Sequence, residues 1–181
     1  GRRVALGQAE GLSGVVTPSS GADQQGTIRC EHLQHEASYS AWGAYAQSKL
    51  ANLLFAYELD RRLSAAKANV TSVACHPGYA ATNLQTRAPQ ESGSTLGLLG
   101  MKAANALFGQ SAEQGALPML FAATEPGIAG GEYVGPGGLL NMRGTPELQE
   151  SNAASRDEET AGRLWDVSEK LTAVEYDLPD A

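Results

Sequence analysis

A tyrosine and a lysine four residues apart are the side chains in this chain most suited to chemistry. Tyr45 and Lys49 stand in the run Trp-Gly-Ala-Tyr-Ala-Gln-Ser-Lys. On a helix, this spacing places a phenol and an ammonium group side by side. A free phenol has a pKa of about 10, so a neighbouring cation is needed to stabilise its phenolate near neutral pH. The pair is therefore suited to proton transfer, although the same spacing also occurs in ordinary surface contacts.

Two apolar segments flank this pair, and each ends in residues that form turns or carry hydroxyl groups. The upstream segment, Val15–Ser19, precedes Ser20, and the downstream segment, Val70–Cys75, precedes Pro77 and Gly78. The sequence between them has the apolar periodicity of a helix. A strand, a helix and a second strand in this order predict an open α/β sheet, in which ligands bind at the carboxyl ends of the strands.

The three segments together resemble the short-chain dehydrogenase/reductase family, and within it the retinol dehydrogenase-like branch. The motifs that carry the resemblance are Ser-Ser-Gly, then Tyr-Ala-Gln-Ser-Lys followed by Leu-Ala-Asn-Leu-Leu-Phe, then His-Pro-Gly-Tyr-Ala-Ala-Thr. They are specific in combination, and the similarity covers most of the chain. It implies an enzyme that uses NAD or NADP to interconvert a small-molecule alcohol and a carbonyl compound by hydride transfer.

The resemblance also implies the role of each site residue. Ser20 would hold the substrate oxygen, Tyr45 would exchange the proton, and Lys49 would assist the phenol and bind the nicotinamide ribose. Three further positions match the segment that holds the nicotinamide carboxamide in the family, namely Pro77, Gly78 and Thr82.

Neighbouring residues offer alternatives to these assignments. Adjacent side chains of a strand point to opposite faces, so only one of Ser19 and Ser20 can face the site, and the family pattern favours Ser20. His76 has a ring that titrates, but a histidine at the end of a strand is more often a packing residue. His32 and His35 lack a third ligand at a suitable spacing, so we expect no metal site.

The expected fold class is α/β, with a partial Rossmann-like doubly wound parallel sheet. Such a sheet consists of two βαβαβ halves, and the glycine-rich phosphate turn belongs to the first half. No G-x-G-x-x-G pattern occurs here. The sequence therefore resembles the second half, with the N-terminal βαβ units missing and the cofactor site incomplete. We expect residues 1–14 to be an irregular lead-in and residues 15–181 to be the catalytic half.

Two other functions fit the same motifs. The missing phosphate turn favours a noncatalytic remnant that binds a ligand or partner without turnover. The Tyr-x-x-x-Lys pair is also shared with epimerases and dehydratases of the extended branch, although the segment Leu50–Phe55 looks more like a retinol dehydrogenase.

The apolar patterns predict six main elements. The first strand contains Pro18, which donates no hydrogen bond to a neighbouring strand and so suits a sheet edge or, equally, the terminal position of a strand. A segment rich in glycine and apolar residues, Leu96–Phe108, suits a cover over a pocket, and a buried helix near the surface explains it nearly as well. The predicted elements are a strand at Val15–Ser19, a helix from Trp42 to about Ala65, a strand at Val70–Cys75, a helix from Ser111 to about Ala123, a strand at Gly131–Gly135 and a helix at Asp157–Val174.

Composition limits the partners and the compartment. The 181 residues are 42% hydrophobic, which suits one domain with a core, and the net charge of −7 arises from Glu147 onward. An almost neutral body with an acidic end does not favour nucleic acid as a partner. We expect no membrane span, and a cytoplasmic location suits the two separate cysteines, Cys30 and Cys75. Dimerisation through the helix that carries Tyr45 is left open.

Overall fold

The computed structural model describes residues 2–5, 13–79 and 109–178. The helices are α1 (Ala41–Ala65), α4 (Ala112–Thr124) and α5 (Glu158–Thr172). The strands are β1 (Arg2–Ala5), β2 (Ser13–Pro18), β3 (Val70–Cys75), β4 (Tyr133–Pro136), β5 (Pro146–Gln149) and β6 (Val174–Asp177). Short 3₁₀ helices are η1 (Gly21–Gln25), η2 (Cys30–His32), η3 (Leu139–Asn141) and η4 (Ala153–Arg156).

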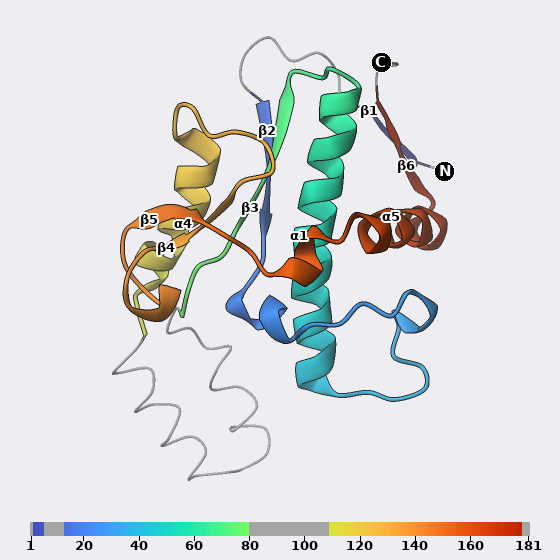
Figure 1. The fold of residues 1–181 in the computed structure, drawn as a ribbon, viewed down its shortest axis with the longest axis horizontal. Coiled ribbons are helices and arrows are strands. Elements are labelled where there is room, and N and C mark those ends of the chain that lie inside the picture. Colours follow the sequence, from blue (N-terminus) through green and yellow to red (C-terminus); the bar gives the residue numbers. More distant parts are fainter. Residues whose placement is uncertain (1, 6–12, 80–108, 179–181) are drawn as a thin grey trace.

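Four strands form a mostly parallel sheet in the order β2-β3-β4-β5. Strands β2, β3 and β4 are parallel, and β5 pairs with β4 in the antiparallel direction. Helix α1 covers one face of this sheet and α4 the other, while α5 lies beyond α1 (Figure 1). This arrangement confirms the predicted α/β, partial Rossmann-like class.

The order of the strands explains the proline in the first predicted strand. Within the described part of the chain, β2 pairs only with β3, so it forms an edge of the sheet. Pro18 lies at its end, opposite Cys75. Because proline has no N–H to donate, it is tolerated at such an edge position.

The helices begin where the sequence offers a capping side chain. The hydroxyl oxygens of Ser40 and Ser111 accept hydrogen bonds from the backbone N–H groups of Gly43 and Gln114, and the Asp157 carboxylate caps α5. Such caps satisfy donors that the first turn of a helix leaves free. The predicted helices therefore lie within two residues of their observed bounds.

The core forms on both sides of α1. Toward the sheet, Leu53 and Tyr57 pack with Ala74 of β3 and with Tyr133 of β4. On the other side, Leu54 belongs to a cluster that includes two residues of α5, Ala161 and Leu164. Helix α1 is thus buried between the sheet and α5, which fixes the side chains at its start relative to the strand ends.

Several strands differ from the expectation. The lead-in was predicted to be irregular, but it contains β1, which pairs in parallel with β6, and β2 begins at Ser13 rather than Val15. Neither β5 nor β6 was predicted. The division at residue 14 stays a prediction, and both Thr82 and the predicted cover Leu96–Phe108 lie outside the described residues.

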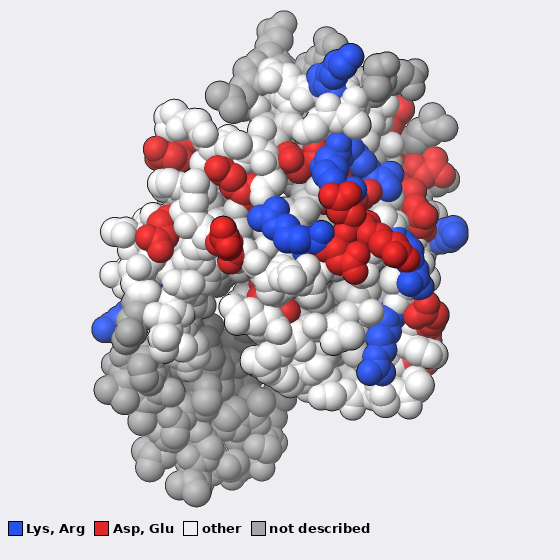
Figure 2. Space-filling model, viewed as in Figure 1, with Lys and Arg blue, Asp and Glu red and all other residues white. Residues whose placement is uncertain are grey.

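Charged side chains gather where α1 and α5 meet. Figure 2 shows acidic and basic groups intermixed over these helices. Buried Glu58 pairs with Arg61 and Arg62 on the same helix, and Arg61 also reaches Glu158 at the start of α5. In residues 2–5, 13–79 and 109–178, no helix combines the length and apolar character needed to cross a bilayer.

Candidate functional site

The hydroxyl residues after β2 have opposite surroundings. Ser19 is 4% exposed, and its hydroxyl donates to the Lys49 carbonyl oxygen over 2.8 Å. Ser20 is partly exposed and begins η1, where its Oγ accepts from the Ala22 N–H over 3.3 Å. Ser19 therefore joins the end of the strand to α1, whereas Ser20 borders open space.

Tyr45 and Lys49 lie together in the first turns of α1. The Lys49 ammonium nitrogen is 5.5 Å from the centre of the Tyr45 ring, within the range of a cation–π contact. The Trp42 ring lies 5.8 Å from the same phenol ring. The Asn52 side chain donates to the Pro18 carbonyl oxygen over 2.8 Å, which adds a second bond between α1 and the end of β2.

The turn after β3 is held by backbone contacts. Gly78 has a φ of +69°, and a Cβ at this position would overlap the Met142 carbonyl and Pro136. The Gln110 side chain donates to the Pro77 carbonyl oxygen. Only glycine fits this combination of a positive φ and close packing without strain.

A cavity of about 390 Å³ lies at the carboxyl ends of β2 and β3. Ser20 and Gly78 both line it, and so does Trp42. Tyr45, Lys49 and Pro77 are not among the described residues that line it. The structure thus brings two of the predicted site residues together in one cavity and leaves the Tyr45–Lys49 pair beside it on α1.

Among the polar residues of this cavity that were not predicted as part of the site, Asp23, His76, Tyr133 and Gln149 contact one another. The Tyr133 hydroxyl donates to the Asp23 carboxylate over 3.2 Å, and the His76 ring lies 5.2 Å from the Tyr133 ring. Asp23 follows Ser20 closely in sequence, and Tyr133 lies within a predicted strand. No motif connects the two, because their contact arises only from the fold.

Burial shifts the titration of these groups. Loss of solvation raises the pKa of Asp23 above 3.8, against the hydrogen bond from Tyr133. Burial also raises the pKa of Tyr133 and lowers that of His76 below 6.5. Burial therefore favours the neutral form of the His76 ring.

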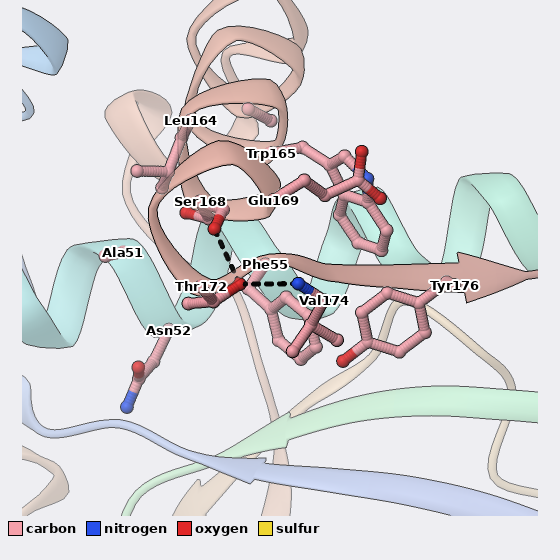
Figure 3. A pocket seen from close by; sticks show the side chains of 11 residues that line it. Ala51, Asn52, Phe55, Leu164, Trp165, Ser168, Glu169, Thr172, Val174 and Tyr176 are labelled. Carbon is pink, nitrogen blue, oxygen red and sulfur yellow. Dashed lines mark hydrogen bonds between the residues drawn. The ribbon is translucent and has the colours of Figure 1, made fainter. Parts of the chain in front are cut away.

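A second cavity, of about 380 Å³, lies between α1, α5 and β6 and is mainly apolar. Figure 3 shows Phe55, Val174 and Tyr176 next to one another at its wall, with the Thr172 hydroxyl bonded to Ser168 and to the Val174 N–H. It shares none of the predicted site residues, so the first cavity is the better candidate for chemistry.

The open α/β sheet, with polar residues at the carboxyl ends of its strands, defines a partial Rossmann-like fold. No family model matches the chain. The chain is 37% identical over 165 residues to polyprenol dehydrogenase of Mus musculus, covering 91% of this chain and 46% of that protein. It is 32% identical over 166 residues to retinol dehydrogenase 14 of Homo sapiens, covering 90% of this chain and 45% of that one.

A solved structure is similar to this chain in both fold and sequence. An uncharacterized protein from Mycobacterium paratuberculosis matches with a TM-score of 0.70 and 35% identity, over 92% of this chain and 53% of that one. The chain belongs to the short-chain dehydrogenase/reductase family, which confirms the resemblance. It spans about half the length of the relatives that it matches.

Proposed function

We propose that this chain carries the catalytic half of an oxidoreductase that interconverts an alcohol and a carbonyl compound with NAD or NADP. The main support is the Lys49 ammonium group 5.5 Å from the centre of the Tyr45 ring. The Lys49 backbone is bonded to Ser19, next to Ser20. A phenol, an ammonium group and a hydroxyl near the ends of two parallel strands suit proton transfer to a carbonyl oxygen.

In the reducing direction, the Tyr45 hydroxyl donates a proton to the carbonyl oxygen as the carbon receives a hydride. Lys49 stabilises the phenolate that remains, and the Ser20 hydroxyl donates a hydrogen bond to the substrate oxygen. The nicotinamide, when bound, supplies the hydride. Gly78 lines the cavity of about 390 Å³, and the segment from Pro77 to Thr82 would hold the nicotinamide carboxamide.

Replacing Tyr45 by Phe tests the proton transfer. In the full-length protein, Tyr45→Phe should lower the rate of alcohol oxidation by about 100-fold or more, because the proton acceptor is lost. The rate is followed by the absorbance of the reduced nicotinamide. Tyr39→Phe is the matched control, since Tyr39 is 74% exposed and should keep full activity. Oxidation that survives Tyr45→Phe would show that the assignment is wrong.

We also propose that the phosphate-binding turn of the cofactor site lies outside this sequence. Calorimetric titration of the 181-residue chain with NADH and with NADPH should then give no micromolar affinity. Micromolar binding would contradict an incomplete cofactor site. An in-frame glycine-rich turn in the coding sequence immediately upstream would support the proposal that the phosphate-binding turn lies outside this sequence.

A noncatalytic binding role is the second candidate. It is favoured by one observation, that Tyr45 and Lys49 are not among the described residues lining the cavity. The two candidates differ in the full-length protein, because a binding protein would bind a ligand without oxidising any alcohol.

The compartment and the assembly are separate proposals. A cytoplasmic location is supported by Cys30 and Cys75, which are free thiols. Dimerisation through α1 stays a prediction, and the packing of α1 between the sheet and α5 does not favour it. Sedimentation tests it, and a monomer at all concentrations would overturn it.

A further inference from the structure

Three hydrogen bonds connect the turn after β3 to β4 and β5 through the ring of His76. The Gly78 N–H donates to His76 Nδ1 over 3.2 Å, and His76 Nε2 lies 2.9 Å from Gln149 Oε1. The Gln149 side-chain nitrogen donates to the Pro136 carbonyl oxygen over 2.9 Å. His76 is only 5% exposed, so water competes little for these bonds.

Backbone groups at both ends fix the direction of every bond in this series. The Pro136 carbonyl can only accept, so the Gln149 amide must turn its nitrogen toward Pro136 and its oxygen toward His76. That oxygen needs a donor, which places the ring proton on Nε2. Nδ1 then carries a lone pair, and the Gly78 N–H donates to it. The contacts therefore select one neutral tautomer of His76.

We propose that His76 and Gln149 are positioning residues that hold the Gly78 peptide in one orientation for the nicotinamide end of the cofactor. Gly78, His76 and Gln149 line the same cavity as Ser20. This inference rests on the proposed function. A side chain that only fills space would not need Nδ1 to accept from the Gly78 N–H and Nε2 to donate to Gln149.

Close packing leaves the ring little freedom to move. A Cβ on Gly135 would overlap His76 Nε2 and Gln149 Oε1, so β4 approaches these groups as only glycine allows. The His76 backbone N–H also donates to the Val134 carbonyl over 2.9 Å. Ring and backbone are thus both held by the sheet.

A second proton on His76 would break this arrangement. Nδ1–H would face the Gly78 N–H, and two donors repel. Burial lowers the pKa of His76 and so favours the neutral ring, whereas the hydrogen bond to Gln149 and the charge of Asp23 both act in the opposite direction. Tyr133 faces the ring at 5.2 Å, and burial raises its pKa, so it stays neutral as well.

The tautomer is measured directly by long-range ¹H–¹⁵N correlation spectra of the histidine rings. His76 should be the neutral Nε2–H form in the unmodified protein, and this preference should weaken in Gln149→Leu, where only the Gly78 N–H still favours it. In His76→Asn, the Asn oxygen can still accept from Gly78, so the Gly78 amide should stay protected from hydrogen exchange. His76→Leu removes the acceptor and should expose it. An Nδ1–H ring in the unmodified protein would overturn the proposal.

Kinetics of the full-length protein test the link to catalysis. Gln149→Glu places a carboxylate beside Nε2 and favours the second proton, so the acid limb of the kcat–pH profile should move up by about one unit or more. The isotope effect with deuterated nicotinamide should rise, because hydride transfer becomes slower. Glu147→Gln is an exposed change on the same strand, and it should alter neither the kcat–pH profile nor the isotope effect. An unchanged profile and isotope effect in Gln149→Glu would refute positioning.

The two proposals fail in different ways. A full-length protein that oxidises no alcohol and reduces no carbonyl overturns the proposed function, and with it the cofactor role of His76. The ring spectra still decide whether Gln149 selects the tautomer. An active enzyme with a freely titrating His76 ring leaves the proposed function intact and overturns only the positioning role.

Discussion

Adjacent residues at the ends of the strands have different surroundings: one is buried and the next lines the cavity. Ser19 and Ser20 are adjacent, yet the first is buried against the Lys49 carbonyl and the second lines the cavity. The alternation of side chains along a strand predicts that only one of them can face a site. At the end of β3, Cys75 is 1% exposed and points into the core, while His76 reaches the cavity.

The two thiols should therefore differ strongly in reactivity. Burial raises the pKa of Cys75 from 9.0 to about 11, which lowers its thiolate fraction about 100-fold at a given pH. Cys30 is partly exposed. With a chromogenic disulfide reagent, the native protein should show one fast and one slow thiol. Cys30→Ser should remove the fast phase, and Cys75→Ser should leave it. Equal rates in the two variants would contradict the burial of β3.

At the scale of elements, the sequence predicts what is long, capped and periodic. Helix α1 has a serine cap and a repeating apolar face, and β3 is rich in β-branched residues, so both were predicted within one residue. Strands β5 and β6 have only four residues each and no apolar run. They form because β4 and β1 offer edges to pair with, and such pairing depends on distant parts of the chain.

The candidate site likewise contains residues that local motifs predict and a contact that they do not predict. Ser20, Tyr45, Lys49 and Gly78 stand in local motifs, which the sequence displays. The partner of His76 is Gln149, 73 residues away, and no local pattern predicts this contact. It exists because β5 pairs with β4 in the antiparallel direction, beside the end of β3.

Trp165 is one of the α5 residues that pack on α1. The Trp165 and Phe55 rings both line the second cavity (Figure 3), and they stack with their centres 5.7 Å apart. The Arg62 guanidinium lies 4.3 Å from the centre of the Trp165 ring, and Trp165 is 5% exposed. Trp165→Ala should lower the free energy of unfolding by about 3 kcal/mol or more, because it leaves a large cavity. Urea denaturation followed by circular dichroism measures this. The control Trp42→Ala, at a site 55% exposed, should cost less than about 1 kcal/mol. Similar losses would contradict this role of Trp165.

At the scale of the whole molecule, buried polar groups join the ends of the strands. Asp23 of η1 bonds to Tyr133 of β4, and His76 bonds to Gln149 of β5. The two titrating members respond to acid in opposite ways. Burial raises the pKa of Asp23, so the folded state holds its proton more tightly than the unfolded chain does. Burial lowers the pKa of His76, so the unfolded chain holds that proton more tightly.

The contribution of His76 to stability should therefore disappear in acid. Its stabilising effect is complete above 6.5, the pKa of an unperturbed histidine, and decreases as the pH falls from there toward the lower pKa of the folded state. The loss amounts to at most about 1.4 kcal/mol per pH unit for one proton. Urea denaturation across this range should show a falling free energy of unfolding in the unmodified protein and a flatter profile in His76→Asn. Asp23→Asn removes the opposing contribution of the Asp23 carboxyl, so the free energy of unfolding should fall more steeply with decreasing pH. His32→Asn, at an exposed site, should leave the pH dependence of the free energy of unfolding unchanged. A profile in His76→Asn that is as steep as in the unmodified protein would show that this ring is not held neutral by the fold.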